Sequence, residues 1–213
     1  MASFAELLSG ILRFFPNTMI VTLLLVGIVT GKLSWIVIAV GAILLAVGVL
    51  TLQYVFGKVY PAGYMPGAAV MEACSLLPVI SSTATYTALP SLWMALTGYF
   101  LTYILVNAVR VYTAMPATAK NNSLPVVQRK GIGLISILAV IVLFIFLMIP
   151  RYRTGCETRM GTVLGLAAGV AMGWVWWQVL DACGSDVFPD IHGVLMGLKP
   201  GLLHTAPVAC TPA

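Results

Sequence analysis

The chain has 213 residues, of which 61% are hydrophobic and only 8% are charged. Its mean hydropathy is +1.04, whereas soluble domains are nearer half apolar and a quarter charged. This composition excludes a soluble globular domain, a disordered chain and a collagen-like chain. Four cysteines are too few for a disulfide scaffold. We therefore predict an all-α, polytopic integral membrane helix bundle.

The formal net charge of +5 has a simple interpretation in such a protein. The basic residues stand mostly beside apolar segments, where lysine and arginine lie against anionic lipid headgroups. Membrane lipids are therefore the expected partners, and no specific nucleic-acid binding is expected.

The first 16 residues differ from the rest of the chain. Apolar side chains recur there at helical spacing, and Ser3 and Glu6 form a capping box at the start. Pro16 then breaks or kinks the helix. Arg13 and Glu6 argue against an uninterrupted span. We predict an amphipathic interfacial helix over residues 1–16.

Five apolar stretches follow, and each is interpreted as a transmembrane helix. They cover residues 17–30, 33–56, 91–112, 131–149 and 161–180. Crossing a bilayer takes about 20 residues, so the first stretch is short unless it continues from the N-terminal helix. The distribution of lysine and arginine between the two sides leaves the orientation open.

These stretches divide the chain into parts. Residues 17–56 form a transmembrane hairpin, and residues 57–90 a membrane-surface or re-entrant connection. Within that connection, the apolar segment 68–80 is too short to span. Residues 91–180 form a three-span bundle, and residues 181–213 an extramembrane C-terminal tail.

Glycines recur every four residues in the last stretch. They are Gly161, Gly165, Gly169 and Gly173. Small residues in this register let another helix approach to backbone contact. The pattern predicts a helix-packing face, either within the bundle or between chains of a homo-oligomer. Asn107, in the third stretch, is a second packing candidate because its amide can hydrogen-bond to a neighbouring helix.

Interface anchors are expected at two places. Trp174, Trp176 and Trp177 come near the end of the last stretch, and their amphipathic rings suit the headgroup level. Arg151 and Arg153 follow the fourth stretch, where long basic side chains reach the interface.

The predicted spans place the four cysteines on two sides of the membrane. Cys74 and Cys156 fall on one side, and Cys183 and Cys210 on the other. The candidate disulfides are therefore Cys183–Cys210 and Cys74–Cys156, with four free thiols as the alternative. A Cys156–Cys183 bond is excluded if the last stretch crosses. That stretch is roughly 30 Å long, while a disulfide needs Cα atoms within about 7 Å.

No motif for catalysis stands in the sequence. A Gly-x-Ser-x-Gly elbow, a His-Glu-x-x-His pair and a P-loop are all missing. The two histidines, His192 and His204, fall in the tail, which excludes haem held between helical histidines. Asp186, Asp190 and His192 match no firm metal signature. We expect no enzyme activity, no catalytic residue, no cofactor and no metal.

Three segments resemble a viral protein family. They are SLPVVQRK at 123–130, RYRTGCET at 151–158 and GWVWWQVLDACGSDVF at 173–188. They are similar to small multispanning proteins in the internal membrane of icosahedral nucleocytoplasmic large DNA viruses, over about residues 90–188. The resemblance implies a structural role in the virion, fixing the internal lipid membrane to the capsid shell with minor capsid proteins as partners. It carries over no catalytic residue.

Two other roles stay open at this point. One is an accessory multispanning subunit of a large membrane complex of the respiratory or translocation type. The other is a small transporter or channel, which is less favoured because the spans lack acidic residues and the chain lacks an internal repeat. The proteins that neighbour the chain in intact membranes would discriminate between these roles.

Overall fold

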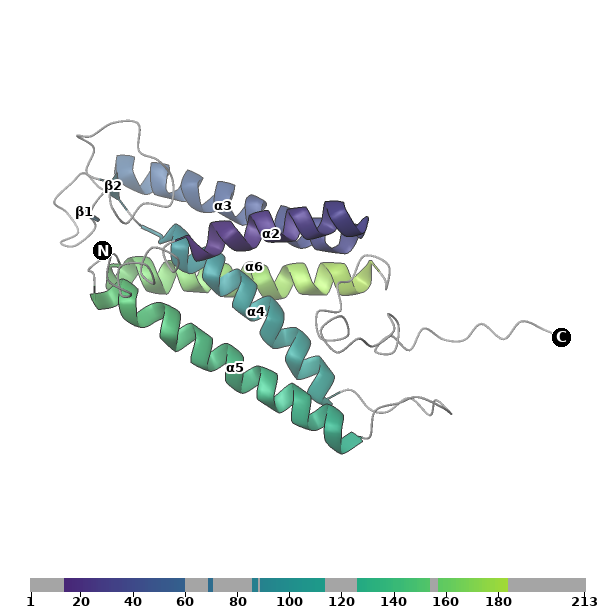
Figure 1. Cartoon of the computed structure of the whole chain (residues 1–213). Helices are drawn as coiled ribbons and strands as arrows, with labels where there is room; N and C mark the ends of the chain where they lie inside the picture. The colour runs from purple at the N-terminus through teal and green to yellow at the C-terminus, as the bar shows by residue number, and fades with distance from the viewer. Residues whose placement is uncertain are drawn as a thin grey trace, which may run out of the picture.

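The computed structural model describes residues 14–59, 69–70, 86–87, 89–113, 126–153 and 157–183. These residues form five helices and one short pair of strands (Figure 1). The helices are α2 (Phe15–Thr30), α3 (Leu33–Val59), α4 (Leu92–Thr113), α5 (Val126–Arg153) and α6 (Arg159–Ala182). Strands β1 (Ala69–Val70) and β2 (Tyr86–Thr87) pair antiparallel, with Ala69 opposite Thr87. The prediction of an essentially all-helical protein is confirmed.

Helices α2 and α3 are joined by a tight turn. Gly31 has φ 64°, a left-handed conformation that glycine adopts without steric cost. The N–H of Lys32 donates to the carbonyl oxygen of Gly27 at 3.1 Å, which closes the end of α2. Pro16 lies in the first turn of α2, where a proline needs no N–H partner. Residues 1–13, which make up most of the predicted interfacial helix, lie outside the described residues.

Four of these helices are long and apolar enough to cross a membrane. The qualifying segments are Leu33–Val59, Leu92–Arg110, Lys130–Ile149 and Arg159–Ala182. Helix α2 has 16 residues and is about 24 Å long, shorter than the roughly 30 Å of a hydrocarbon core. Four of the five expected spans thus correspond to helices long and apolar enough to cross, and the crossing of α2 stays a prediction.

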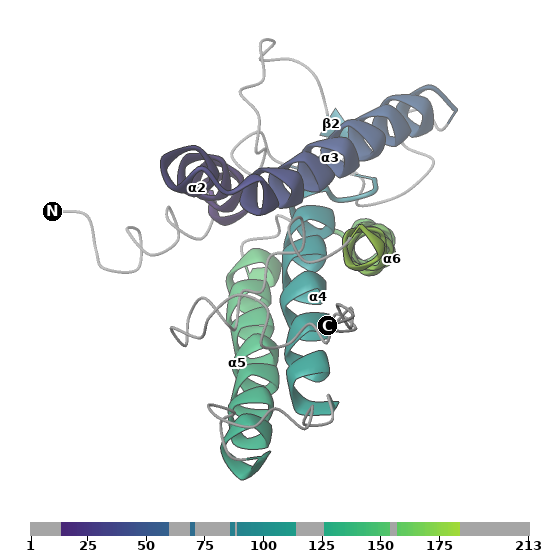
Figure 2. The same cartoon turned by 90° about the vertical axis from the view of Figure 1, so that its right-hand side faces the viewer.

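Helix α4 lies at the centre of the bundle. Figure 2 shows α2 and α3 above it, α5 beside it and α6, viewed almost end-on, on its other flank. All residues from 91 to 100 are buried. Trp93, Tyr99 and Tyr103 are among the largest fully buried side chains. The core therefore follows α4, and the other helices turn much of their apolar surface outward.

The chain order gives the bundle two ends. One end, which we call the Glu157 end, contains the C-termini of α3 and α5 and the N-termini of α4 and α6. The opposite end, which we call the Asp181 end, contains the C-termini of α4 and α6 and the N-termini of α3 and α5 (Figure 1). The connection from α3 to α4 begins and ends at the Glu157 end. Of the apolar segment 68–80, only Ala69 and Val70 are described, so the prediction that it does not cross lies outside the described residues.

Candidate functional site

The glycine strip of α6 faces α4 of the same chain. A Cβ atom on Gly165 would overlap the carbonyl oxygen of Ser91, and one on Gly169 would overlap that of Ala95. A Cβ on Gly173 would lie 2.8 Å from the carbonyl oxygen of Tyr99. The two helices therefore meet at backbone contact, which only glycine permits. The sequence left open whether this strip packs within or between chains, and the structure places it against α4.

The first turns of α4 and α6 are joined by a backbone hydrogen bond. The N–H of Ser91 donates to the carbonyl oxygen of Gly161 at 3.0 Å. Ser91 also caps α4, because its Oγ accepts the N–H of Met94 at 3.2 Å. Thr158 caps α6 in the same way, accepting the N–H of Gly161 at 2.9 Å. Two capped helix starts thus lie side by side at the Glu157 end.

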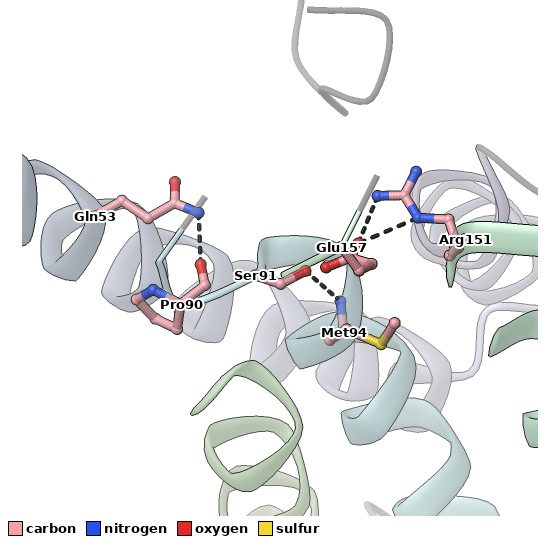
Figure 3. A network of polar contacts seen from close by, with 6 residues as sticks. All are labelled: Gln53, Pro90, Ser91, Met94, Arg151 and Glu157. Atoms are coloured by element: carbon pink, nitrogen blue, oxygen red, sulfur yellow. Dashed lines mark hydrogen bonds and ion pairs between the residues drawn. The ribbon is translucent and has the colours of Figure 1, made fainter. Parts of the chain in front are cut away.

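A buried ion pair lies beside these caps (Figure 3). Arg151, in the last turn of α5, donates from Nε at 3.1 Å and from Nη2 at 2.6 Å to Oε1 of Glu157. The two side chains are only 8% and 1% exposed. The Arg151 guanidinium carbon lies 5.0 Å from the centroid of the Trp93 ring, which adds a cation–π contact. The pair connects the end of α5 to the residue that precedes the Thr158 cap.

The helix dipoles favour this arrangement of charges. Arg151 is near the C-terminus of α5, and Glu157 is next to the N-terminus of α6. A cation at a C-terminus and an anion at an N-terminus are each stabilised, typically by about 0.3–1 kcal/mol. Oε2 of Glu157 is buried and has no hydrogen-bond partner among the described residues. Close by, Nε2 of Gln53 donates to the carbonyl oxygen of Pro90 at 2.6 Å, which ties α3 to the start of α4.

A second ion pair joins α4 and α6 at the Asp181 end. Nη1 of Arg110 contacts Oδ1 of Asp181, and the two side chains are 28% and 31% exposed. The Arg110 guanidinium carbon lies 5.4 Å from the centroid of the Trp177 ring. Arg110 of α4 therefore contacts two side chains of α6, one acidic and one aromatic. The α4–α6 contact is closed at both ends by polar groups and filled between them by the glycine strip.

The predicted interface anchors occupy different environments. Trp174 is exposed and Arg153 is exposed, which suits an anchor. Trp177 is buried against α4, and Nε1 of Trp176 donates to the carbonyl oxygen of Val37 at 3.1 Å. Arg151 is also buried rather than placed at the surface. Three of the five anchors thus hold helices together.

The physical reason for this difference is the presence of partners. Arg151 can be buried because Glu157 neutralises it, and Trp176 can be partly buried because a backbone carbonyl accepts its N–H. Sequence reasoning missed the Arg151–Glu157 and Arg110–Asp181 pairs. A signal for the first was present, since opposite charges flank a five-residue connection between two apolar stretches.

The remaining predicted residues are placed as follows. Asn107 is buried in α4, at 1% exposure. Cys183 is exposed at the C-terminal end of α6. Cys74, Cys156 and Cys210 lie outside the described residues, so the disulfide pairing stays a prediction.

Neither a cofactor site nor a metal site was predicted. Within the described ranges, no cluster of three or more His, Cys, Asp or Glu residues could hold a metal ion. Asp186, Asp190, His192 and His204 fall outside those ranges. No protein-family model, no curated protein and no solved structure matches this sequence.

Proposed function

We propose that the protein is a polytopic integral membrane protein with a structural role. Four helices long and apolar enough to cross a membrane support this placement. So do the outward faces of the helices, where large apolar side chains such as Ile135 and Val142 of α5 are 67% and 65% exposed. Contiguous apolar surface of this kind is unfavourable in water and is covered by lipid in a bilayer.

The observation that carries the structural role is the use of the charged side chains within the bundle. Arg110 and Asp181 join α4 to α6, and Arg151 and Glu157 join α5 to α6. The first pair neutralises its charges across the α4–α6 contact, and the second across the short connection between α5 and α6. Charged groups in transporters and pumps instead line a pathway for substrate or protons. The pairing here supports a rigid scaffold.

The resemblance of residues 90–188 to viral internal-membrane proteins supports a location for this scaffold. We propose that it lies in the internal membrane of an icosahedral virion and holds capsid proteins through its loops and its C-terminal tail. The tail follows Asp181, whose contact with Arg110 fixes the end of α6 relative to α4. A partner bound to the tail would thereby be connected to the core of the bundle.

Cross-linking in intact particles tests this proposal. Lys199 in the tail and Lys120 in the connection between α4 and α5 are the lysines at which an amine-reactive cross-linker would be mapped. We expect peptides from these lysines to be linked to capsid proteins, and the links to be lost when the particles are dissolved in detergent before cross-linking.

Two outcomes would contradict the proposal. One is cross-links to electron-transfer or translocation subunits in cellular membranes, which would identify an accessory subunit instead. The other is a chain that sodium carbonate extracts from membranes, because a protein spanning the bilayer stays in the pellet.

A further inference from the structure

We propose that Lys58, Arg153 and Arg159 form a binding surface for the phosphate headgroups of anionic phospholipids. We call these three residues the basic rim. This inference rests on the proposed placement in a membrane and is independent of the virion role. It assigns a lipid class to one end of the bundle.

The basic rim gathers cations from three helices at the same end. Lys58 is in the last turn of α3, Arg153 is the last residue of α5, and Arg159 is the first residue of α6. Figure 1 shows these helix ends at the same Glu157 end of the bundle, and Figure 2 shows the end of α3 to one side of α5 and α6. Because the apolar segments of all three helices stop there, the rim lies at the level of the headgroups in a bilayer.

The cations of the rim are available to an external anion. All three side chains are exposed, and no carboxylate in the described part of the chain pairs with them. Glu157 is the acidic residue described at this end, and Arg151 already neutralises it. Nζ of Lys58 lies 4.8 Å from the centroid of the exposed Tyr54 ring, an aromatic that suits the interface. Within the described residues, this end therefore presents three exposed positive charges that no carboxylate pairs with.

The Asp181 end provides a natural comparison. Asp181 contacts Arg110 there, and Lys32 and Lys130 are exposed cations at this end. Lys32 precedes α3 and Lys130 is near the start of α5. Each cation near an anionic surface contributes about fivefold to binding. The three cations of the basic rim should therefore give selectivity well above tenfold.

The experiment measures lipid selectivity at the protein surface. The full chain is reconstituted in phosphatidylcholine vesicles containing spin-labelled phosphatidylglycerol or spin-labelled phosphatidylcholine. The motionally restricted signal gives the association of each lipid with the helices. The triple variant K58Q/R153Q/R159Q is compared with the native chain and with the control K32Q/K130Q.

We expect the native chain and the control to prefer phosphatidylglycerol, and the triple variant to lose at least about tenfold of that preference. The preference of the native chain should also fall in 1 M salt, where the screening length is about 3 Å. If the triple variant does not fold, two measurements still test the proposal. The charge-preserving variant K58R/R153K/R159K should keep the preference for phosphatidylglycerol, and added salt should reduce that preference in the native chain.

Equal selectivity in the native chain and the triple variant would overturn the basic rim. Loss of selectivity in the control would also overturn it, by moving the lipid contact to the Asp181 end. Failure of the chain to insert into vesicles would instead contradict the proposed membrane placement, so the two failures are distinguishable.

Discussion

Two N–H groups of Arg151 donate to a single carboxylate oxygen of Glu157, across the short connection between α5 and α6. This contact is nearly sealed from solvent, with the two side chains 8% and 1% exposed. The Trp93 ring of α4 lies against the guanidinium group. One pair of residues thus connects three helices at the Glu157 end.

Breaking this ion pair from one side should be costly. In Arg151→Met, Glu157 is left buried without its counter-charge, and the expected loss is about 3–5 kcal/mol of the free energy of unfolding. In the double variant Arg151→Met/Glu157→Gln, no charge is left unpaired, and the loss should be smaller than for Arg151→Met alone. Unfolding in mixed micelles, followed by circular dichroism, measures both. A single variant within about 1 kcal/mol of the native chain would contradict the buried pair.

The second ion pair should matter less. Arg110 and Asp181 are about 30% exposed, so solvent screens their attraction. Arg110→Gln should reduce the free energy of unfolding by about 1 kcal/mol or less, and added salt should reduce the stability of the native chain towards that of the variant. The same unfolding assay compares it with Arg151→Met. A larger loss from Arg110→Gln than from Arg151→Met would reverse the order that burial predicts.

Replacing a glycine of the strip by a residue with a large side chain should separate α4 from α6. A Leu side chain at Gly169 has no room, because even a Cβ would overlap the carbonyl oxygen of Ala95. We expect Gly169→Leu to cost roughly 3 kcal/mol or more, or to prevent folding. Ala167→Leu adds the same side chain at an exposed position of α6 and is the matched control. Leu164→Ala, also at an exposed position, should likewise have a small effect. Equal losses from Gly169→Leu and Ala167→Leu would show that the strip is not a contact face.

The two ends of the bundle should be labelled from opposite sides of the membrane. Single cysteines at Lys58 and Arg153 are at the Glu157 end, and those at Lys32 and Lys130 are at the Asp181 end. In a background without the native cysteines, a membrane-impermeant maleimide added to sealed vesicles should modify one pair before lysis and the other only after it. Labelling of Lys58 and Arg153 from different sides would mean that a further crossing lies between α3 and α5.

Much of the fold can be predicted from local patterns of the sequence. The apolar stretches 33–56, 91–112, 131–149 and 161–180 each coincide with the body of a helix, because every backbone polar group in such a run can be satisfied within the helix itself. The short Gly31–Lys32 turn likewise follows from one residue type, since Gly31 adopts a positive φ. These features need no knowledge of distant parts of the chain.

The sequence by itself also marked the glycine strip as a surface for close approach, but only the tertiary structure decided that α4 covers it. The same holds for Arg151 and Trp176, whose residue types suit a headgroup layer. In the structure Arg151 is buried, and Trp176 is half-buried against α3. Burial of a polar side chain depends on whether a partner reaches it, and here the partners are Glu157 and the carbonyl oxygen of Val37. Helix formation is a property of neighbouring residues, whereas the contact between Trp176 and Val37 arises only when α3 and α6, which are far apart in the chain, are packed together.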